Sequence, residues 1–168
     1  MWPSKARLQG WVLAVIGASV MLAPATSEGC DLVVTEHRAD REVLRWPIDE
    51  QPPTFTVSFI HSVLGTPVVD RYEVRPVQGQ WKSFLVEETF QGQGYGLPYG
   101  ETSPGERFER TAQGWRLVMN RLVDPLVQLP LASQNVELRL QNRSVRLADL
   151  SRYSVRIEVQ GCPSDKSR

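Results

Sequence analysis

The chain of 168 residues contains only two cysteines and two histidines, and it has no net charge. Nineteen Lys and Arg residues balance nineteen Asp and Glu residues, so the chain lacks the positive excess that nucleic-acid-binding domains carry. The basic residues are spread along the chain, without the cluster that binding to a membrane surface favours. We therefore expect neither nucleic acid nor a membrane surface as a partner.

Long apolar runs are also absent, with a single exception at residues 10–27. Lys5 and Arg7 precede this uncharged run, and small residues close it at Ala25. The order of basic, apolar and small residues is typical of a secretory signal peptide. We expect residues 1–25 to be removed and the protein to be periplasmic or otherwise exported, with no membrane insertion after cleavage. A retained membrane anchor is the alternative.

Removal of this peptide leaves residues 26–168, which is enough chain for a single domain with one core. Cys30 opens the domain and Cys162 closes it. In an oxidising compartment we expect the two thiols to form a disulfide that ties the ends together. A redox role is less favoured, because redox pairs usually stand two residues apart at the start of a helix.

Helical periodicity is nearly absent after residue 30, and strand-like alternation of apolar and polar residues takes its place. Turn-forming pairs such as Gln78-Gly79 and Gln113-Gly114 separate the alternating runs. We predict an all-β domain, an antiparallel β-sandwich or partly open barrel of about nine or ten strands. One helical turn is expected at residues 148–151. The strands are expected near residues 31–35, 42–47, 54–60, 67–77, 81–90, 107–111, 115–120, 126–129, 136–140, 144–147 and 152–160, with one or two of these merging.

One segment, Gln91–Glu106, breaks the alternation with five glycines and two prolines. A loop of this length in a compact domain is usually functional or mobile. It is not a dinucleotide or phosphate-binding fingerprint, because no helix follows and no Lys-Ser/Thr pair closes it. The glycines allow positive φ angles or close approach of the backbone, and exposed amides in such a turn can bind an anion. A purely structural crossover is the alternative.

The strand alternation places His61 on the inward side, at the rim of a strand that contains Phe59. A histidine there can act as a base, a metal ligand or a hydrogen-bond anchor. Ser62 is not favoured as a nucleophile, because Ile60 and Leu64 stand where a nucleophile elbow has glycine. Neighbouring residues on a strand also point to opposite faces, so His61 is poorly placed to activate Ser62.

Five acidic residues near the same segments are candidates for metal binding or paired-carboxylate chemistry. Their spacing is not diagnostic of a metal site, and acids on strands usually mark the solvent face. They are Asp70, Glu73, Glu87, Glu88 and Glu101.

The segments Phe59–Val63, Thr66–Tyr72 and Gly94–Pro98 resemble the motifs of an uncharacterised bacterial family of small exported proteins. Members of that family are often encoded beside tripartite TRAP transporters of the TAXI type. The family pattern has His-Ser-Val, a Pro-Val-x-Glu-x-aromatic strand and Gly-Ala-Gly-Leu-Pro. Asp70 stands where the family has glutamate, and Tyr95 stands where it has alanine. The resemblance implies that the protein is encoded beside a solute importer, and it supplies no known activity.

Three hypotheses follow for the site. The first is a non-catalytic exported domain without a cofactor, whose rim pocket binds a TRAP transporter component or a small polar solute. The second is a metal-assisted or acid/base hydrolase with His61 as base or ligand and Asp70 or Glu101 as partner. The third makes His61 a scaffold that hydrogen-bonds the glycine loop and fixes its shape. The candidate binding residues are His61, Ser62, Asp70, Gly94, Tyr95, Gly96, Pro98 and Glu101.

Overall fold

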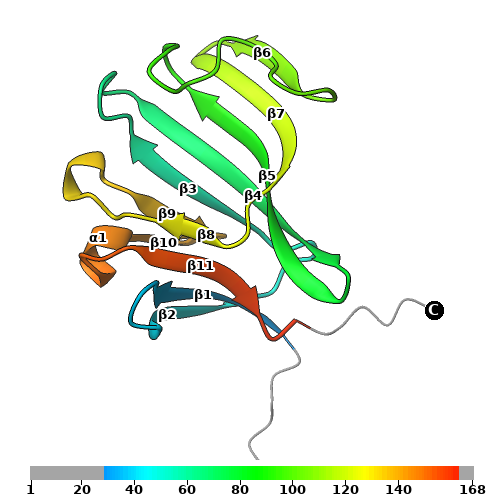
Figure 1. Ribbon diagram of the computed structural model, residues 1–168, viewed down its shortest axis with the longest axis vertical. Helices are drawn as coiled ribbons and strands as arrows, with labels where there is room; N and C mark the ends of the chain where they lie inside the picture. The colour runs from blue at the N-terminus through cyan, green and yellow to red at the C-terminus, as the bar shows by residue number, and fades with distance from the viewer. Residues whose placement is uncertain (1–28, 163–168) are drawn as a thin grey trace, which may run out of the picture.

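The computed structural model describes residues 29–162 and shows two antiparallel sheets that pack as a sandwich-like all-β fold (Figure 1). The smaller sheet has the order β2-β1-β11-β8 and the larger has the order β10-β9-β3-β4-β5-β7-β6. The strands of the smaller sheet are β1 (Cys30–Glu36), β2 (Arg41–Ile48), β8 (Leu126–Gln128) and β11 (Val155–Gln160). Those of the larger sheet are β3 (Thr54–Ile60), β4 (Pro67–Val77), β5 (Gln80–Phe90), β6 (Arg107–Thr111), β7 (Gly114–Leu122), β9 (Glu137–Leu140) and β10 (Arg143–Arg146).

This architecture confirms the predicted fold class, with eleven separate strands in the described residues where about nine or ten were expected. None of the expected mergers occurs, because a turn or loop separates each strand from the next. The predicted helical turn is present one residue earlier, as α1 (Leu147–Leu150). A short 3₁₀ turn, η1 (Ala132–Gln134), lies between β8 and β9.

The core lies between the sheets and follows the alternation of the sequence. Phe55 and Val57 of β3 are buried, and Thr56 between them is half-exposed. β4 repeats the pattern, with Val68 and Val74 on the buried side. Strands that bury one face and wet the other are characteristic of antiparallel sheets.

The hairpin connections have the backbone that their residues predict. Between β4 and β5, Gln78 and Gly79 have φ angles of 51° and 77°, as a two-residue hairpin with the twist of the strands requires. At the start of β7, Gly114 has φ 144°, and a Cβ there would lie 2.2 Å from the carbonyl oxygen of Phe90. Only glycine allows this close approach.

A disulfide joins Cys30 to Cys162, as predicted. Cys30 begins β1 and Cys162 follows the end of β11, and these two strands are paired neighbours in the smaller sheet. The bond therefore links the first and last strands of the described chain, which lie side by side in the smaller sheet (Figure 1).

The expected signal peptide, residues 1–25, lies outside the described residues. Within residues 29–162, no helix has the length and apolar character needed to cross a bilayer.

Candidate functional site

The motif segments singled out in the sequence converge at one end of the larger sheet. The loop after β3 holds His61 and Ser62, and the loop after β5 is the glycine-rich segment 91–106. β3, β4 and β5 are consecutive antiparallel neighbours, so the end of β3 and the end of β5 meet at the same edge (Figure 1). The Thr66 hydroxyl donates a hydrogen bond to the carbonyl of Gln91 at 2.8 Å and joins the two loops.

His61 is buried directly after β3, and both of its ring nitrogens face backbone groups. The Nδ1 atom accepts hydrogen bonds from the N–H groups of Val63 and Leu64, each at 3.2 Å. A nitrogen that accepts carries no proton, so the proton of the neutral ring lies on Nε2. Nε2 lies 3.2 Å from the carbonyl oxygen of Tyr95 and donates to it. His61 thus connects its own turn to the glycine loop, while Ser62 beside it is exposed.

The bond from His61 reaches a tight turn at Gly94–Leu97. The Leu97 N–H donates to the Gly94 carbonyl at 3.1 Å, and the Gly94 N–H returns a bond of 3.3 Å. The two central residues, Tyr95 and Gly96, have φ angles of 55° and 102°. Positive φ is uncommon for a residue with a side chain. The closing bonds and the His61 bond hold the tyrosine in this backbone conformation.

This turn presents aromatic side chains to solvent. Tyr95 is 73% exposed, Tyr99 is 75% exposed, and Val63 of the neighbouring turn is 62% exposed. The Tyr99 hydroxyl lies over Gly94, where a Cβ would come within 2.4 Å of it. Leu97 points the other way and is buried in the core. Leu97 therefore anchors the loop in the core, while the two tyrosine side chains of the loop face solvent.

The far half of the glycine loop is fixed by a polar clamp. Arg121 of β7 donates to Glu106 through two nitrogens, at 2.9 and 2.6 Å, and to the Thr102 hydroxyl at 2.7 Å. Burial alone would raise the pKa of Glu106, but the Thr102 N–H and the Arg121 guanidinium hold that pKa below its usual value. Glu101 accepts a hydrogen bond from the Phe108 N–H at 3.0 Å and joins the loop to β6.

Asp70 lies on the face of β4 that carries Val68 and Val74, and it is 8% exposed. The Tyr72 hydroxyl donates to its Oδ2 atom at 3.3 Å. Glu88 of β5 is its direct cross-strand neighbour, and buried oxygens of both acids, Asp70 Oδ1 and Glu88 Oε1, have no hydrogen-bond partner. Burial, followed by the charge of Glu88, raises the pKa of Asp70 to about 7. Burial also raises the pKa of Glu88.

The other candidate acids face solvent in ion pairs. Glu73 binds Arg75 at 2.7 Å, and Glu87 lies between Arg71 at 3.6 Å and Arg116 at 3.9 Å. Within the described part of the chain, no three His, Cys, Asp or Glu side chains are grouped as a metal ligand set.

The structure thus brings His61 together with Gly94, Tyr95 and Gly96, and it joins Asp70 and Glu101 to other partners. Asp70 hydrogen-bonds to Tyr72, and Glu101 to the backbone of β6. The sequence did not reveal the Arg121 clamp, because Arg121 is 15 positions from Glu106 and 19 positions from Thr102. The sequence-based prediction also placed strand acids on the solvent face, although Asp70 shares the parity of Val68 and Tyr72, and that parity was visible in the sequence.

Replacing His61 by alanine is expected to lower the free energy of unfolding by about 2–3 kcal/mol, because it leaves three backbone groups without their partner. Ser62→Ala is the matched control, since this side chain is exposed and is expected to change stability by less than about 0.5 kcal/mol. Urea unfolding of both variants measures the difference. Equal stability of His61→Ala and the wild type would show that the ring does not hold the loop.

Comparison with protein families matches residues 55–147 to a domain of unknown function, DUF1850. Neither the curated proteins nor the solved structures contain a match to the chain. The matched segment covers more than half of the 168 residues and includes His61, Asp70 and the whole glycine loop. The chain therefore belongs to the DUF1850 family.

Proposed function

We propose that this domain is a non-catalytic, exported binding module that presents the turn around Tyr95 to a protein partner. The observation that carries the proposal is the bonding of His61, whose two ring nitrogens are both used to hold backbone. For His61 to act as a general base, one of these nitrogens would have to lose its backbone partner. A role in shaping the loop needs no such change.

The chemistry of the presented surface favours a protein partner. Tyr95, Tyr99 and Val63 are exposed on a backbone that His61 and the Arg121 clamp hold in place. Tyrosine supplies a large contact area with little loss of side-chain freedom, and it is enriched at the centres of protein interfaces. A rigid loop also reduces the entropy that binding must overcome.

The partner that we propose is a component of a TAXI-type TRAP transporter, in the compartment to which this protein is exported. This follows from the family resemblance of the motif segments and from the expected signal peptide. The disulfide between Cys30 and Cys162 is compatible with export, because such bonds persist in oxidising compartments.

The double variant Tyr95→Ala/Tyr99→Ala tests this proposal. The mature protein is used to capture transporter components from membranes of its host, and the captured proteins are identified by mass spectrometry. We expect the double variant to reduce capture at least tenfold, because interface tyrosines commonly contribute more than about 1–2 kcal/mol each. Its melting temperature should stay close to that of the wild type, since both side chains are mostly in solvent.

The matched control is Tyr153→Ala, which removes a tyrosine that is 63% exposed on the segment before β11. It should capture the same components as the wild type. Capture that survives the double variant, or that is lost equally in the control, would contradict the proposal.

A further inference from the structure

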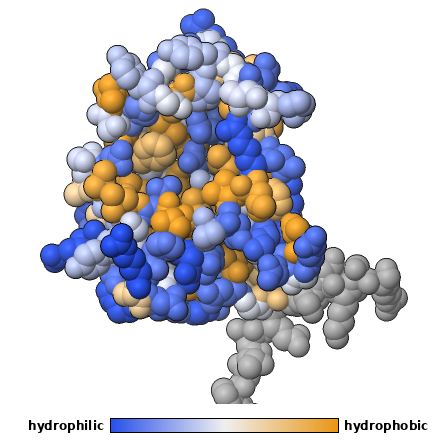
Figure 2. All heavy atoms as spheres, in the orientation of Figure 1, coloured by the Kyte–Doolittle hydropathy of each residue, from blue (hydrophilic) through white to orange (hydrophobic). Residues whose placement is uncertain are grey.

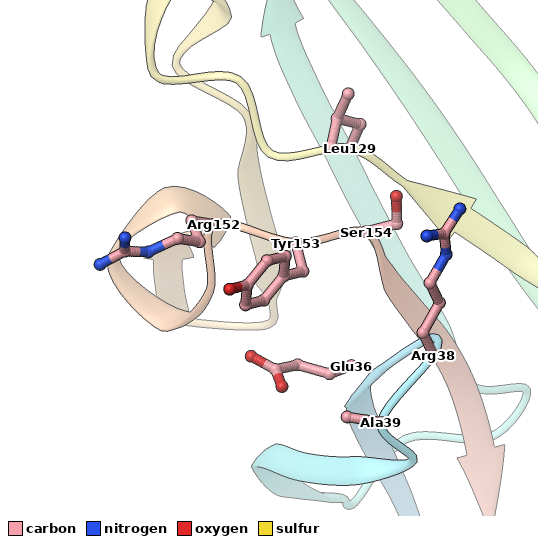
Figure 3. A pocket seen from close by; sticks show the side chains of 7 residues that line it. All are labelled: Glu36, Arg38, Ala39, Leu129, Arg152, Tyr153 and Ser154. Atoms are coloured by element: carbon pink, nitrogen blue, oxygen red, sulfur yellow. The ribbon is translucent and has the colours of Figure 1, made fainter.

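A concave site lies on the smaller sheet, away from the glycine loop. It encloses about 410 Å³ between the turn that follows β1, the segment between α1 and β11, and Leu129 beyond the end of β8 (Figure 3). Pockets that bind small molecules commonly measure about 300–1,000 Å³. The size is therefore suitable for a small organic ligand.

The walls of this pocket are joined by a chain of hydrogen bonds. The His37 N–H donates to the Ser154 carbonyl at 2.8 Å and ties the two walls together. The Ser151 hydroxyl donates to the Glu36 carboxylate at 2.7 Å and accepts from the Tyr153 N–H at 3.0 Å. Tyr153 is thereby held at the pocket by the same network that fixes Glu36. The pocket is formed before any ligand arrives.

Charge in this region is unbalanced. Glu36 is neutralised by Arg41, whose guanidinium contacts both carboxylate oxygens, at 3.2 and 2.7 Å. Hydrogen bonds from Arg41 and Ser151 hold the pKa of Glu36 below its usual value, so this carboxylate keeps its charge paired. Arg38 and Arg152 line the pocket, and neither makes a hydrogen bond or ion pair in the described structure, whereas most other arginines there are paired.

Figure 3 shows how these groups lie. The guanidinium of Arg38 lies on the same side as the Ser154 hydroxyl, and that of Arg152 lies at the opposite end. In this view the ring of Tyr153 lies between the two ends, and Leu129 also lines the pocket. Figure 2 shows hydrophobic surface across the middle of this face, where β8 and its flanking segments run, and Val127, Leu129 and Leu131 of these segments are exposed. The lining of this pocket thus combines cationic, hydroxyl and apolar side chains.

The geometry points to a binding site for a small organic anion with an apolar body, such as an arylalkyl carboxylate. Its carboxylate accepts hydrogen bonds from the Arg38 guanidinium and the Ser154 hydroxyl, the kind of charge-assisted contact that arginine favours. Its apolar body packs against the Tyr153 ring and Leu129. Because carboxylate and apolar body are recognised at neighbouring places, the ligand must carry both.

This inference does not depend on the proposed function. Every residue that lines the pocket except Leu129 lies outside the segment 55–147 that matches the family. None of them belongs to the His61 turn or to the glycine loop. Failure of one proposal therefore leaves the other standing.

A titration of the mature protein followed by amide NMR shifts tests the site. The probe is 3-phenylpropionate, and the neutral comparison is 3-phenylpropanamide, which has the same shape without the charge. With 3-phenylpropionate we expect saturable shifts of the backbone N–H signals of Arg38, Ala39, Tyr153 and Ser154. We expect 3-phenylpropanamide to bind at least about tenfold more weakly.

Arg38→Gln should weaken binding of 3-phenylpropionate by about tenfold, which corresponds to one charge-assisted contact. Arg143→Gln is the matched control, because Arg143 also has no ion pair in the described structure and does not line the pocket. It should bind as the wild type does. The inference would be overturned if 3-phenylpropionate gave no saturable shifts or shifted only other residues. It would also be overturned if 3-phenylpropanamide bound equally well, or if both variants lost the same affinity for 3-phenylpropionate.

Discussion

Replacing Cys30 and Cys162 together by serine is expected to lower the free energy of unfolding by about 5 kcal/mol. The two cysteines are 132 positions apart, so the bond closes nearly the whole described chain into one loop. In the chain-entropy treatment, a loop of this length loses about 5 kcal/mol of freedom in the unfolded state. Domains commonly have a total stability of about 5–15 kcal/mol, so the variant should lose between about a third and all of its stability.

Denaturant unfolding of the wild type, the double serine variant and the reduced wild type measures this effect. The reduced wild type should match the variant, and dithiothreitol should not affect the variant further. A double variant as stable as the oxidised wild type would mean that the strands β1 and β11 hold together without the bond.

Replacing Asp70 by asparagine is expected to raise the free energy of unfolding at pH 8 by about 2–4 kcal/mol. In the unfolded chain this carboxyl ionises near 3.8, and in the folded protein its pKa is raised to about 7. Between these values the folded state binds more protons, so the wild type loses stability as the pH rises. A difference of about three pKa units corresponds to roughly 4 kcal/mol. Asparagine cannot ionise, and its amide places a donor beside the unpartnered oxygen of Glu88.

The measurement is unfolding of wild type and variant at several pH values between 4 and 8. The stability advantage of Asp70→Asn should be near zero at pH 4 and should grow until about pH 7. Asp49→Asn is the control, since it removes an exposed acid and should give no such growth. An advantage that stays constant with pH would show that Asp70 is not held in its neutral form.

Much of the fold follows from short-range patterns in the sequence. Alternation in residues 54–60 predicts β3, and the pair Gln78-Gly79 predicts the turn between β4 and β5, because both depend on neighbouring residues only. The pairing of the two end cysteines could be predicted for another reason, namely that the chain has only these two cysteines. The order of strands in the two sheets depends on contacts between distant segments, which no local pattern contains.

The site could be predicted only in part for the same reason. The sequence singles out His61 and the glycine loop, but the bond that joins His61 to Tyr95 spans 34 positions. The pocket on the smaller sheet could not be predicted from local pattern, because it depends on contacts such as the one between Glu36 and Ser151, which are 115 positions apart. The burial of Asp70 could have been inferred from its parity with Tyr72. The assumption that strand acids face solvent concealed it.

Site-specific photo-crosslinking in the native host tests the central claim most directly, namely that a transporter component docks on the tyrosines above His61. A photoreactive residue replaces Tyr99 in one strain and Tyr153 in another, and the crosslinked products are identified by mass spectrometry. We predict that position 99 captures a transporter component and that position 153 does not. A protein that is produced normally but captures no such component from position 99, or captures the same one from both positions, would contradict the account.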